Sequence, residues 1–272
     1  MSWRSVGHSV QGARHLQHNQ PCQDACAIRV IEDIVVMALA DGHGDKKHAH
    51  SDVGAQVAVD VACELLIEAL VNHRNQVGIS DRRLEQFLNG SLAKRIIWEW
   101  NQRLNIQLHF SGDGAWNEGL ISYGTTLLAA AIAPDFAIFF QLGDGDILLL
   151  TEGEAAIVFE QSEELYGTAT HSLCQPSSYH HAKVHCCSFA LPPELVILTT
   201  DGIRDSLQGD REQYIRIAHW LSQQVESKGW ATFTDQLPSW LSTLSEKGNG
   251  DDVSLAFAQW QPRSQKPTQE LQ

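Results

Sequence analysis

Aspartate residues stand at the ends of four strongly apolar segments of this chain, each beside a glycine. The first segment, 34–40, runs directly into Asp41-Gly42-His43-Gly44. Three further apolar segments are flanked in the same way, by Gly143-Asp144, by Asp201-Gly202 and by Gly250-Asp251-Asp252. Apolar runs rich in branched residues and bounded by glycine are typical of buried strands. The sequence therefore predicts four strand ends that each carry a carboxylate.

Carboxylates that converge on one end of a sheet repel one another unless cations lie between them. Ligand sets made only of oxygen favour hard divalent ions such as Mg²⁺ or Mn²⁺ over zinc. If the four strand ends point in different directions, each is instead an ordinary Asp-Gly turn. The spacing alone leaves both interpretations open.

The same motifs resemble those of the metal-dependent serine/threonine protein phosphatase family of type 2C, in order and in approximate spacing. The motifs that carry the resemblance are Asp41-Gly42-His43-Gly44, Gly124-Thr125-Thr126, Gly143-Asp144, Asp201-Gly202 and Asp251-Asp252-Val253-Ser254. Gln23-Asp24 is similar to the first acidic motif of that family, and the resemblance extends from about Val6 to Phe257. The motifs are specific as a set, whereas each one alone is not.

The order of strand-like and helical segments predicts an α+β protein with antiparallel sheets covered by helices. The resemblance implies a four-layer α-β-β-α sandwich, in which two stacked antiparallel sheets are flanked by helices and the metals lie at one end. No linker-like run divides the chain. We therefore expect a single type 2C phosphatase-like domain over residues 1–260 and a polar C-terminal tail over 261–272.

Apolar periodicity predicts four helical regions. The first extends from Ser51, as a candidate N-cap, to about Leu70. The second begins near Ser80, is expected to be interrupted at Gly90, and continues to Leu104. Two more helices are predicted over about 211–226 and 232–246.

The resemblance implies a set of metal ligands for two ions, Mn²⁺ or Mg²⁺, and a weaker third ion. Asp41 is expected to bridge the first two ions, with the Gly42 carbonyl on one of them. Asp201 and Asp251 are expected to hold the other ion, and Asp24 to bind directly or through water. Asp144, together with Asp201, is the candidate pair for the third ion.

The predicted chemistry is hydrolysis of a phosphate monoester. Two divalent ions about 3.5–4 Å apart can share one bridging hydroxide, lower its pKa and hold the phosphoryl group for in-line attack. His43 follows the metal-binding Asp-Gly directly and is the candidate to protonate the departing serine or threonine oxygen. The competing interpretation is a turn histidine with a structural hydrogen bond.

The residue that binds the substrate phosphate departs from the family pattern. The family carries an arginine five residues before its first aspartate, and here that position is Asn19. The family also usually has a glutamate directly before this aspartate, and here that position is occupied by Gln23. Arg14 and His15 are the candidate replacements, and the alternative is that both are ordinary surface residues.

Composition limits the partners and the compartment. With 19 basic and 33 acidic residues the net charge is −14, which argues against nucleic acid as a partner. No stretch is long and apolar enough to span a membrane. The N-terminus has no apolar signal region and the six cysteines show no metal-ligand spacing. We therefore expect reduced thiols and a cytoplasmic protein.

The sequence thus predicts metal-dependent hydrolysis of phosphoserine and phosphothreonine in proteins, with a Ser/Thr kinase or its targets as the partners. A catalytically weak relative that binds or regulates phosphoproteins is one alternative. The departures at Asn19 and Gln23 favour it, whereas the intact Asp41, Asp201 and Asp251 oppose it. A metallohydrolase for small phosphoesters is the other.

Overall fold

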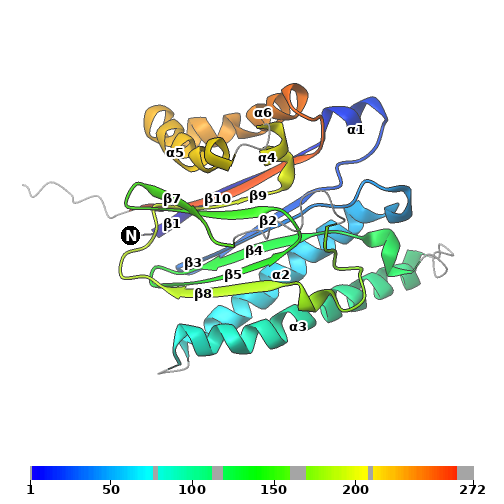
Figure 1. Cartoon of the computed structure of the whole chain (residues 1–272), viewed down its shortest axis with the longest axis horizontal. Coiled ribbons are helices and arrows are strands. Elements are labelled where there is room, and N and C mark those ends of the chain that lie inside the picture. Colours follow the sequence, from blue (N-terminus) through cyan, green and yellow to red (C-terminus); the bar gives the residue numbers. More distant parts are fainter. Residues whose placement is uncertain (1, 76–78, 112–118, 160–169, 208–210, 262–272) are drawn as a thin grey trace, which may run out of the picture.

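The fold is two five-stranded antiparallel sheets stacked face to face, with helices on both outer faces (Figure 1). The computed structural model describes residues 2–75, 79–111, 119–159, 170–207 and 211–261, with side chains left out at 106–111, 211 and 213. This arrangement is the predicted α-β-β-α sandwich.

Each sheet draws its strands from distant parts of the chain. The first sheet has the order β1-β10-β9-β6-β7, and its strands are Ser2–Val10, Val253–Gln261, Leu195–Thr199, Asp146–Thr151 and Glu154–Ile157. The second sheet has the order β2-β3-β4-β5-β8, and its strands are Ala25–Ile31, Ile34–Ala40, Leu127–Ile132, Phe136–Leu142 and Lys183–Ser188. The predicted strands 34–40 and 136–142 are confirmed to the residue.

The helices divide between the two outer faces. Helices α2 (Ser51–Arg74) and α3 (Asp81–Ser111) cover the second sheet, and α5 (Arg211–Lys228) and α6 (Trp230–Lys247) cover the first. Short helices α1 (Ala13–Gln17), η1 (Lys46–His48), η3 (Leu120–Tyr123), η5 (Ser178–His180) and α4 (Asp201–Ser206) complete the described elements. None of the helices within the described residues combines the length and apolar character needed to cross a membrane.

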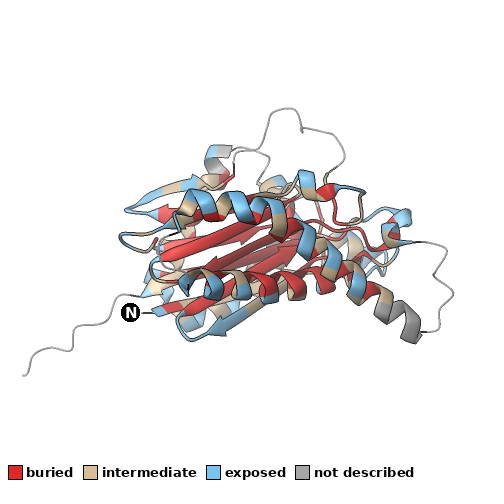
Figure 2. Ribbon diagram, turned by 90° about the horizontal axis from the view of Figure 1, so that it is seen from below, coloured by how far each residue is buried: buried red, intermediate tan, exposed pale blue. Residues whose placement is uncertain are grey.

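Strand β3 shows why the central strands are apolar without a break. Its side chains alternate between two cores: Ile34, Val36 and Ala38 face the helical layer. Val35 and Met37 face the opposite sheet. Successive side chains of a strand point to opposite faces, so a strand covered on both faces must be apolar at every position. Figure 2 shows the resulting buried layers between the helices and the sheets.

Two helix predictions are corrected. Ser51 is not the N-cap of α2: His50 occupies that position, and the buried Ser51 hydroxyl has no hydrogen-bond partner among the described residues. Helix α3 continues through Gly90, because the buried stripe that includes Leu88, Leu92 and Ile96 packs against the second sheet and α2. Such packing outweighs the helical cost of one glycine, about 1 kcal/mol.

The first residue of the predicted tail is part of a strand. Gln261 belongs to β10, where it pairs with Ser2 of β1. The rest of the predicted tail, 262–272, lies outside the described residues.

Candidate active site

A cavity of about 810 Å³ opens at one end of the sandwich. All nine residues that the sequence indicated for the site line this cavity: Arg14, His15, Asp24, Asp41, Gly42, His43, Asp144, Asp201 and Asp251. Antiparallel pairing explains their convergence. Ala25 at the start of β2 pairs with Ala40 at the end of β3, which brings Asp24 beside Asp41. Asp146 at the start of β6 pairs with Thr199 at the end of β9, which brings Asp144 toward Asp201.

Three carboxylates, those of Asp24, Asp41 and Asp201, form the floor of the cavity. Asp41 and Asp201 are close enough to share a hydrogen bond. Burial and then the neighbouring Asp24 and Asp201 carboxylates raise the pKa of Asp41 well above its usual range. Burial and then Asp144 raise the pKa of Asp201 to about 6. The protein alone therefore leaves the negative charge of this cluster undercompensated.

The donor set suits divalent cations with oxygen ligands. Asp24 accepts hydrogen bonds from Thr200 Oγ1 at 3.1 Å and Ser254 Oγ at 2.6 Å, yet burial and then Asp252 still raise its pKa. Among the described residues no three acidic, histidine or cysteine side chains already stand in the geometry of a finished metal site. Bound cations would therefore have to draw the carboxylates together. The mutual repulsion that raises the pKa values of these carboxylates would favour cation binding.

Asp144 is held by two residues that sequence reasoning missed. Thr170 Oγ1 donates a hydrogen bond to Asp144 Oδ2. The Arg204 guanidinium donates to the Asp144 carbonyl at 3.0 Å and to Asp146 Oδ2 at 2.8 Å. Arg204 comes three residues after Asp201, and this closeness in sequence was the only available signal.

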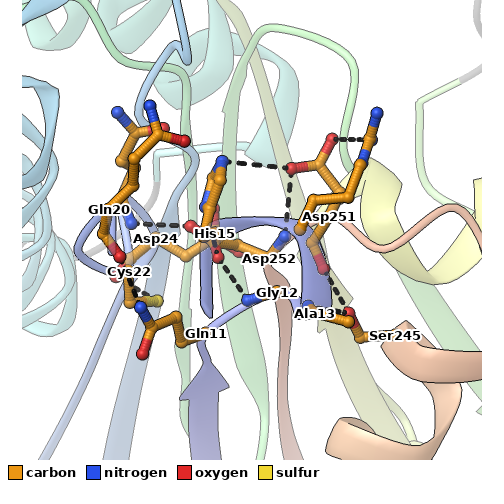
Figure 3. Close-up of polar contacts among 12 residues, drawn as sticks. Gln11, Gly12, Ala13, His15, Gln20, Cys22, Asp24, Ser245, Asp251 and Asp252 are labelled. Atoms are coloured by element: carbon orange, nitrogen blue, oxygen red, sulfur yellow. Dashed lines mark hydrogen bonds and ion pairs between the residues drawn. The ribbon is translucent and has the colours of Figure 1, made fainter. Parts of the chain in front are cut away.

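The neighbours Asp251 and Asp252 differ in their exposure and in their hydrogen-bond partners. The Asp251 side chain is half-exposed, and its Oδ2 lies 3.4 Å from the Arg14 guanidinium. Asp252 is buried and accepts from the backbone N–H of Gly12 at 2.6 Å (Figure 3). It also accepts from the backbone N–H of Gln23 at 2.6 Å. Nothing in the sequence separated the two neighbours, because their partners lie more than two hundred residues away.

His43 lies in the wall of the cavity. Its backbone N–H donates to the Gly124 carbonyl at 3.0 Å, which fixes the turn after Asp41. Burial and then the adjacent His48 lower the pKa of His43 to about 4. The ring is therefore uncharged at neutral pH in the metal-free protein. His48 itself is buried, and the sequence offered no reason to single it out.

Arg14 and His15 reach the cavity from α1. The Arg14 side chain is 57% exposed, whereas the His15 side chain is 13% exposed. Asn19, at the position of the family arginine, lies in an exposed turn with a left-handed backbone (φ 52°) and is not among the lining residues. The structure thus brings both candidate phosphate-binding residues to the site and keeps Asn19 away from it.

Comparison with known proteins agrees with this arrangement. A family model described as protein phosphatase 2C matches residues 11–242. The curated "Serine/threonine-protein phosphatase 3" of Escherichia coli (strain K12) is 29% identical over 154 residues, which is 55% of this chain and 54% of that protein. The match therefore spans about half the length of that relative.

Solved structures share the fold at low sequence identity. Serine/threonine phosphatase Stp1 from Staphylococcus aureus superposes with a TM-score of 0.59 and 14% identity, over 96% of both chains. The catalytic domain of serine threonine protein phosphatase PstP, in complex with two manganese ions, gives a TM-score of 0.53 and 19% identity over 94% of this chain and 97% of that chain. Since the family model covers well over half of the sequence, the chain belongs to the protein phosphatase 2C family.

Proposed function

We propose that the protein hydrolyses phosphoserine and phosphothreonine in protein substrates, with two divalent cations, Mn²⁺ or Mg²⁺, and a weaker third. The observation that carries the proposal is the undercompensated carboxylate cluster of Asp24, Asp41 and Asp201 at the floor of the cavity. Family membership and the name of the E. coli relative support the substrate class, and the two manganese ions in the PstP structure support the cofactor.

The proposed ligands divide by position. Asp41 and the Gly42 carbonyl would hold one cation, and Asp201 with Asp251 the other. Asp24 would bind directly or through water, and Asp144 would contribute to a third site. When bound, such cations neutralise phosphoryl oxygen charge and lower the pKa of the attacking water.

The chain's own side chains would position the phosphoryl group and assist the leaving oxygen. Arg14 and His15 enter the cavity from α1 and supply donors for phosphoryl oxygens. His43 is the residue proposed to donate a proton to the departing serine or threonine oxygen. Because its pKa is about 4, the protonated ring is a strong acid that is scarcely populated at neutral pH.

The proposal also covers the domain organisation, the partners and the cellular compartment of the protein. Residues 1–260 would act as one catalytic domain, and the partner would be a Ser/Thr kinase or the substrates of one. Nucleic acid is not expected as a partner, given the net charge of −14. A membrane is not expected as a partner either, because no stretch of the sequence is long and apolar enough to span one. All six cysteines are free thiols, which suits the reducing cytoplasm.

Hydrolysis of a phosphothreonine peptide and of p-nitrophenyl phosphate, each with Mn²⁺, Mg²⁺ or EDTA, tests the proposal. We expect manganese-stimulated turnover that EDTA abolishes. Asp41→Ala and Asp201→Ala should each lower kcat/KM by about 100-fold or more, since several kcal/mol of charge stabilisation are lost. Asp235→Ala, on the exposed face of α6, is the matched control and should leave turnover unchanged.

Other outcomes identify the alternatives. A folded protein that binds Mn²⁺ and turns over neither substrate would contradict the enzyme and favour a phosphoprotein-binding module. Nucleotide or sugar-phosphate hydrolysis comparable to that of the phosphopeptide would favour a metallohydrolase for small phosphoesters.

A further inference from the structure

The turn between β5 and β6, which carries Asp144, is held by two long side chains. Gln141 Nε2, at the end of β5, donates to the Gly143 carbonyl at 3.2 Å and to the Gly145 carbonyl at 2.6 Å. Arg204 Nη1 donates to the Asp144 carbonyl between them at 3.0 Å. Three successive carbonyls of the turn therefore accept hydrogen bonds from side chains, which fixes the backbone on which Asp144 stands.

Arg204 connects this turn to the helix that carries the other candidate ligand of the third cation. It comes three residues after Asp201 on α4, so the two side chains leave the helix on the same side. The Arg204 side chain is 20% exposed, and the same Nη1 donates to Asp146 Oδ2 at 2.8 Å. One guanidinium thus joins the helix that begins with Asp201 to the turn that carries Asp144.

Asp146 is an anchored partner for this guanidinium. Its side chain is 3% exposed, and it shares a hydrogen bond with the hydroxyl of Tyr214 on α5. The Tyr214 hydroxyl also hydrogen-bonds to Thr199 Oγ1, and both of these residues are buried. Thr199 in turn pairs with Asp146 across β9 and β6. The carboxylate that holds Arg204 is therefore tied to a helix and to the neighbouring strand, and it fixes the position of the guanidinium.

Arg204 acts on the cavity through the backbone of the turn. Arg204, Asp146 and Tyr214 are not among the described residues that line the cavity. The Asp144 and Asp201 carboxylates both line it, and they lie close enough for Asp144 to raise the pKa of Asp201. The separation of these two carboxylates depends on where the turn is held relative to α4, and Arg204 is the side chain that spans the two elements.

We propose that Arg204 is a positioning residue that sets the separation of Asp144 and Asp201, and with it the affinity for the weaker third cation. Asp146 and Tyr214 anchor its guanidinium. The inference rests on the proposed function, which assigns Asp144 to that cation. It deepens the function by making one ion depend on a residue that contacts neither the cation nor the substrate. The other two ions have their remaining ligands outside this network and should not depend on it.

Mn²⁺ titration, with free Mn²⁺ measured by electron paramagnetic resonance, counts the bound ions and ranks their affinities without turnover. Arg204→Lys keeps the charge but shortens the side chain, so that it no longer reaches both acceptors. We expect this variant to weaken the weakest class of bound Mn²⁺ by roughly tenfold, the scale of one lost hydrogen bond from a charged group, and to leave the tighter classes unchanged. Arg216→Lys, the same change at a side chain 73% exposed on α5, is the matched control and should bind Mn²⁺ like wild type.

Further variants separate position from charge. Asp144→Ala should remove the weakest class, and adding Arg204→Lys to it should cause no further change, because both substitutions act on one site. Wild-type Mn²⁺ binding in Arg204→Lys would overturn the inference. Tighter binding in Arg204→Gln, which lacks the positive charge, would then identify Arg204 as a source of repulsion alone.

Tyr214→Phe keeps the buried ring and removes only the hydroxyl that holds Asp146, in case Arg204→Lys fails to fold. We expect a roughly threefold loss of affinity, confined to the weakest class, since one hydrogen bond behind the guanidinium is lost. Equal losses in every class, or a wild-type isotherm with no weaker class, would contradict the positioning role.

The outcomes separate this inference from the proposed function. If wild type hydrolyses the phosphopeptide but Arg204→Lys binds every class of Mn²⁺ normally, the function stands and the inference fails. If the weakest class depends on both Arg204 and Asp144 while no phosphoester is turned over, the positioning role stands and the proposed hydrolysis fails.

Discussion

The imidazole ring of His48 packs against that of His43, with the ring centroids 4.8 Å apart. His48 is buried, and its Nδ1 hydrogen-bonds to the Ile121 carbonyl, which fixes the orientation of its ring. Gly124 borders both rings: a Cβ there would lie 2.4 Å from His48 Nδ1 and 2.9 Å from Cδ2 of His43. The packing of His43 in the cavity wall therefore depends on a residue without a side chain at position 124.

Gly124→Ala should displace both histidine rings. We expect kcat for the phosphothreonine peptide to fall by roughly tenfold or more, the cost of misplacing a catalytic group. The overpacked Cβ should also destabilise the fold by about 1–3 kcal/mol. Peptide kinetics together with urea denaturation check both effects.

Gly90→Ala is the matched control for that substitution. Position 90 lies inside α3, and a Cβ there would meet no atom within 4 Å. Alanine should stabilise the protein by about 0.5–1 kcal/mol and leave kcat unchanged. Equal kinetic losses in both variants would contradict the proposed role of Gly124.

His43→Ala should discriminate between leaving groups. A threonine alkoxide is a poor leaving group and needs a proton, whereas nitrophenolate departs without one. Loss of a general acid costs about 100-fold or more, so we expect that loss with the phosphopeptide and a loss under about tenfold with p-nitrophenyl phosphate. The ratio of kcat values for the two substrates is the measurement. Equal losses on both substrates would instead indicate a turn histidine that supports the site structurally.

Asp201→Asn should stabilise the metal-free protein in a pH-dependent way. Burial and then Asp144 raise the pKa of Asp201 to about 6 from its ordinary value of 3.8. The folded state thus resists ionisation of this group, and the penalty grows as pH rises from about 4 to 6. Above that range it amounts to at most about 3 kcal/mol.

Urea denaturation in EDTA at pH 8 and at pH 4 measures this effect. We expect Asp201→Asn to be more stable than wild type at pH 8 and equal to it at pH 4. Asp235→Asn makes the same chemical change at an exposed position and should alter neither value. A loss of stability at pH 8 would mean that the Asp41–Asp201 hydrogen bond outweighs the repulsion.

The sequence was enough to predict that carboxylates stand at the ends of buried strands. It was not enough to predict which residues hold these carboxylates in place. Asp41 and Asp201 each follow a fully buried strand and precede a glycine, and both signals are local. Asp252 contacts Gly12 and Gln23 across more than two hundred residues. No local pattern encodes such a partner, because it depends on which strand ends the topology places side by side.

The helices show the same limit. The predicted break in α3 at Gly90 was wrong because tertiary packing overrides a single unfavourable residue. The predicted Ser51 cap was wrong because the helix begins at Ser51 itself, one residue earlier than a cap at that position requires, and the hydroxyl is buried instead.

Manganese affinity should fall as the pH is lowered through about 6. In the metal-free protein Asp201 takes up a proton near that pH, and the pKa of Asp41 is also raised by burial and by its acidic neighbours. A cation must displace each bound proton, so affinity should drop about tenfold per pH unit for every proton released.

Titration calorimetry at pH 7.5 and pH 5.5, in two buffers of different ionisation enthalpy, counts those protons. We expect weaker Mn²⁺ binding and a larger proton release at pH 5.5, together with a Tm that rises with Mn²⁺ concentration. The Asp201→Asn variant should release fewer protons and bind Mn²⁺ more weakly at both pH values. A pH-independent affinity would place the bound manganese away from this carboxylate cluster.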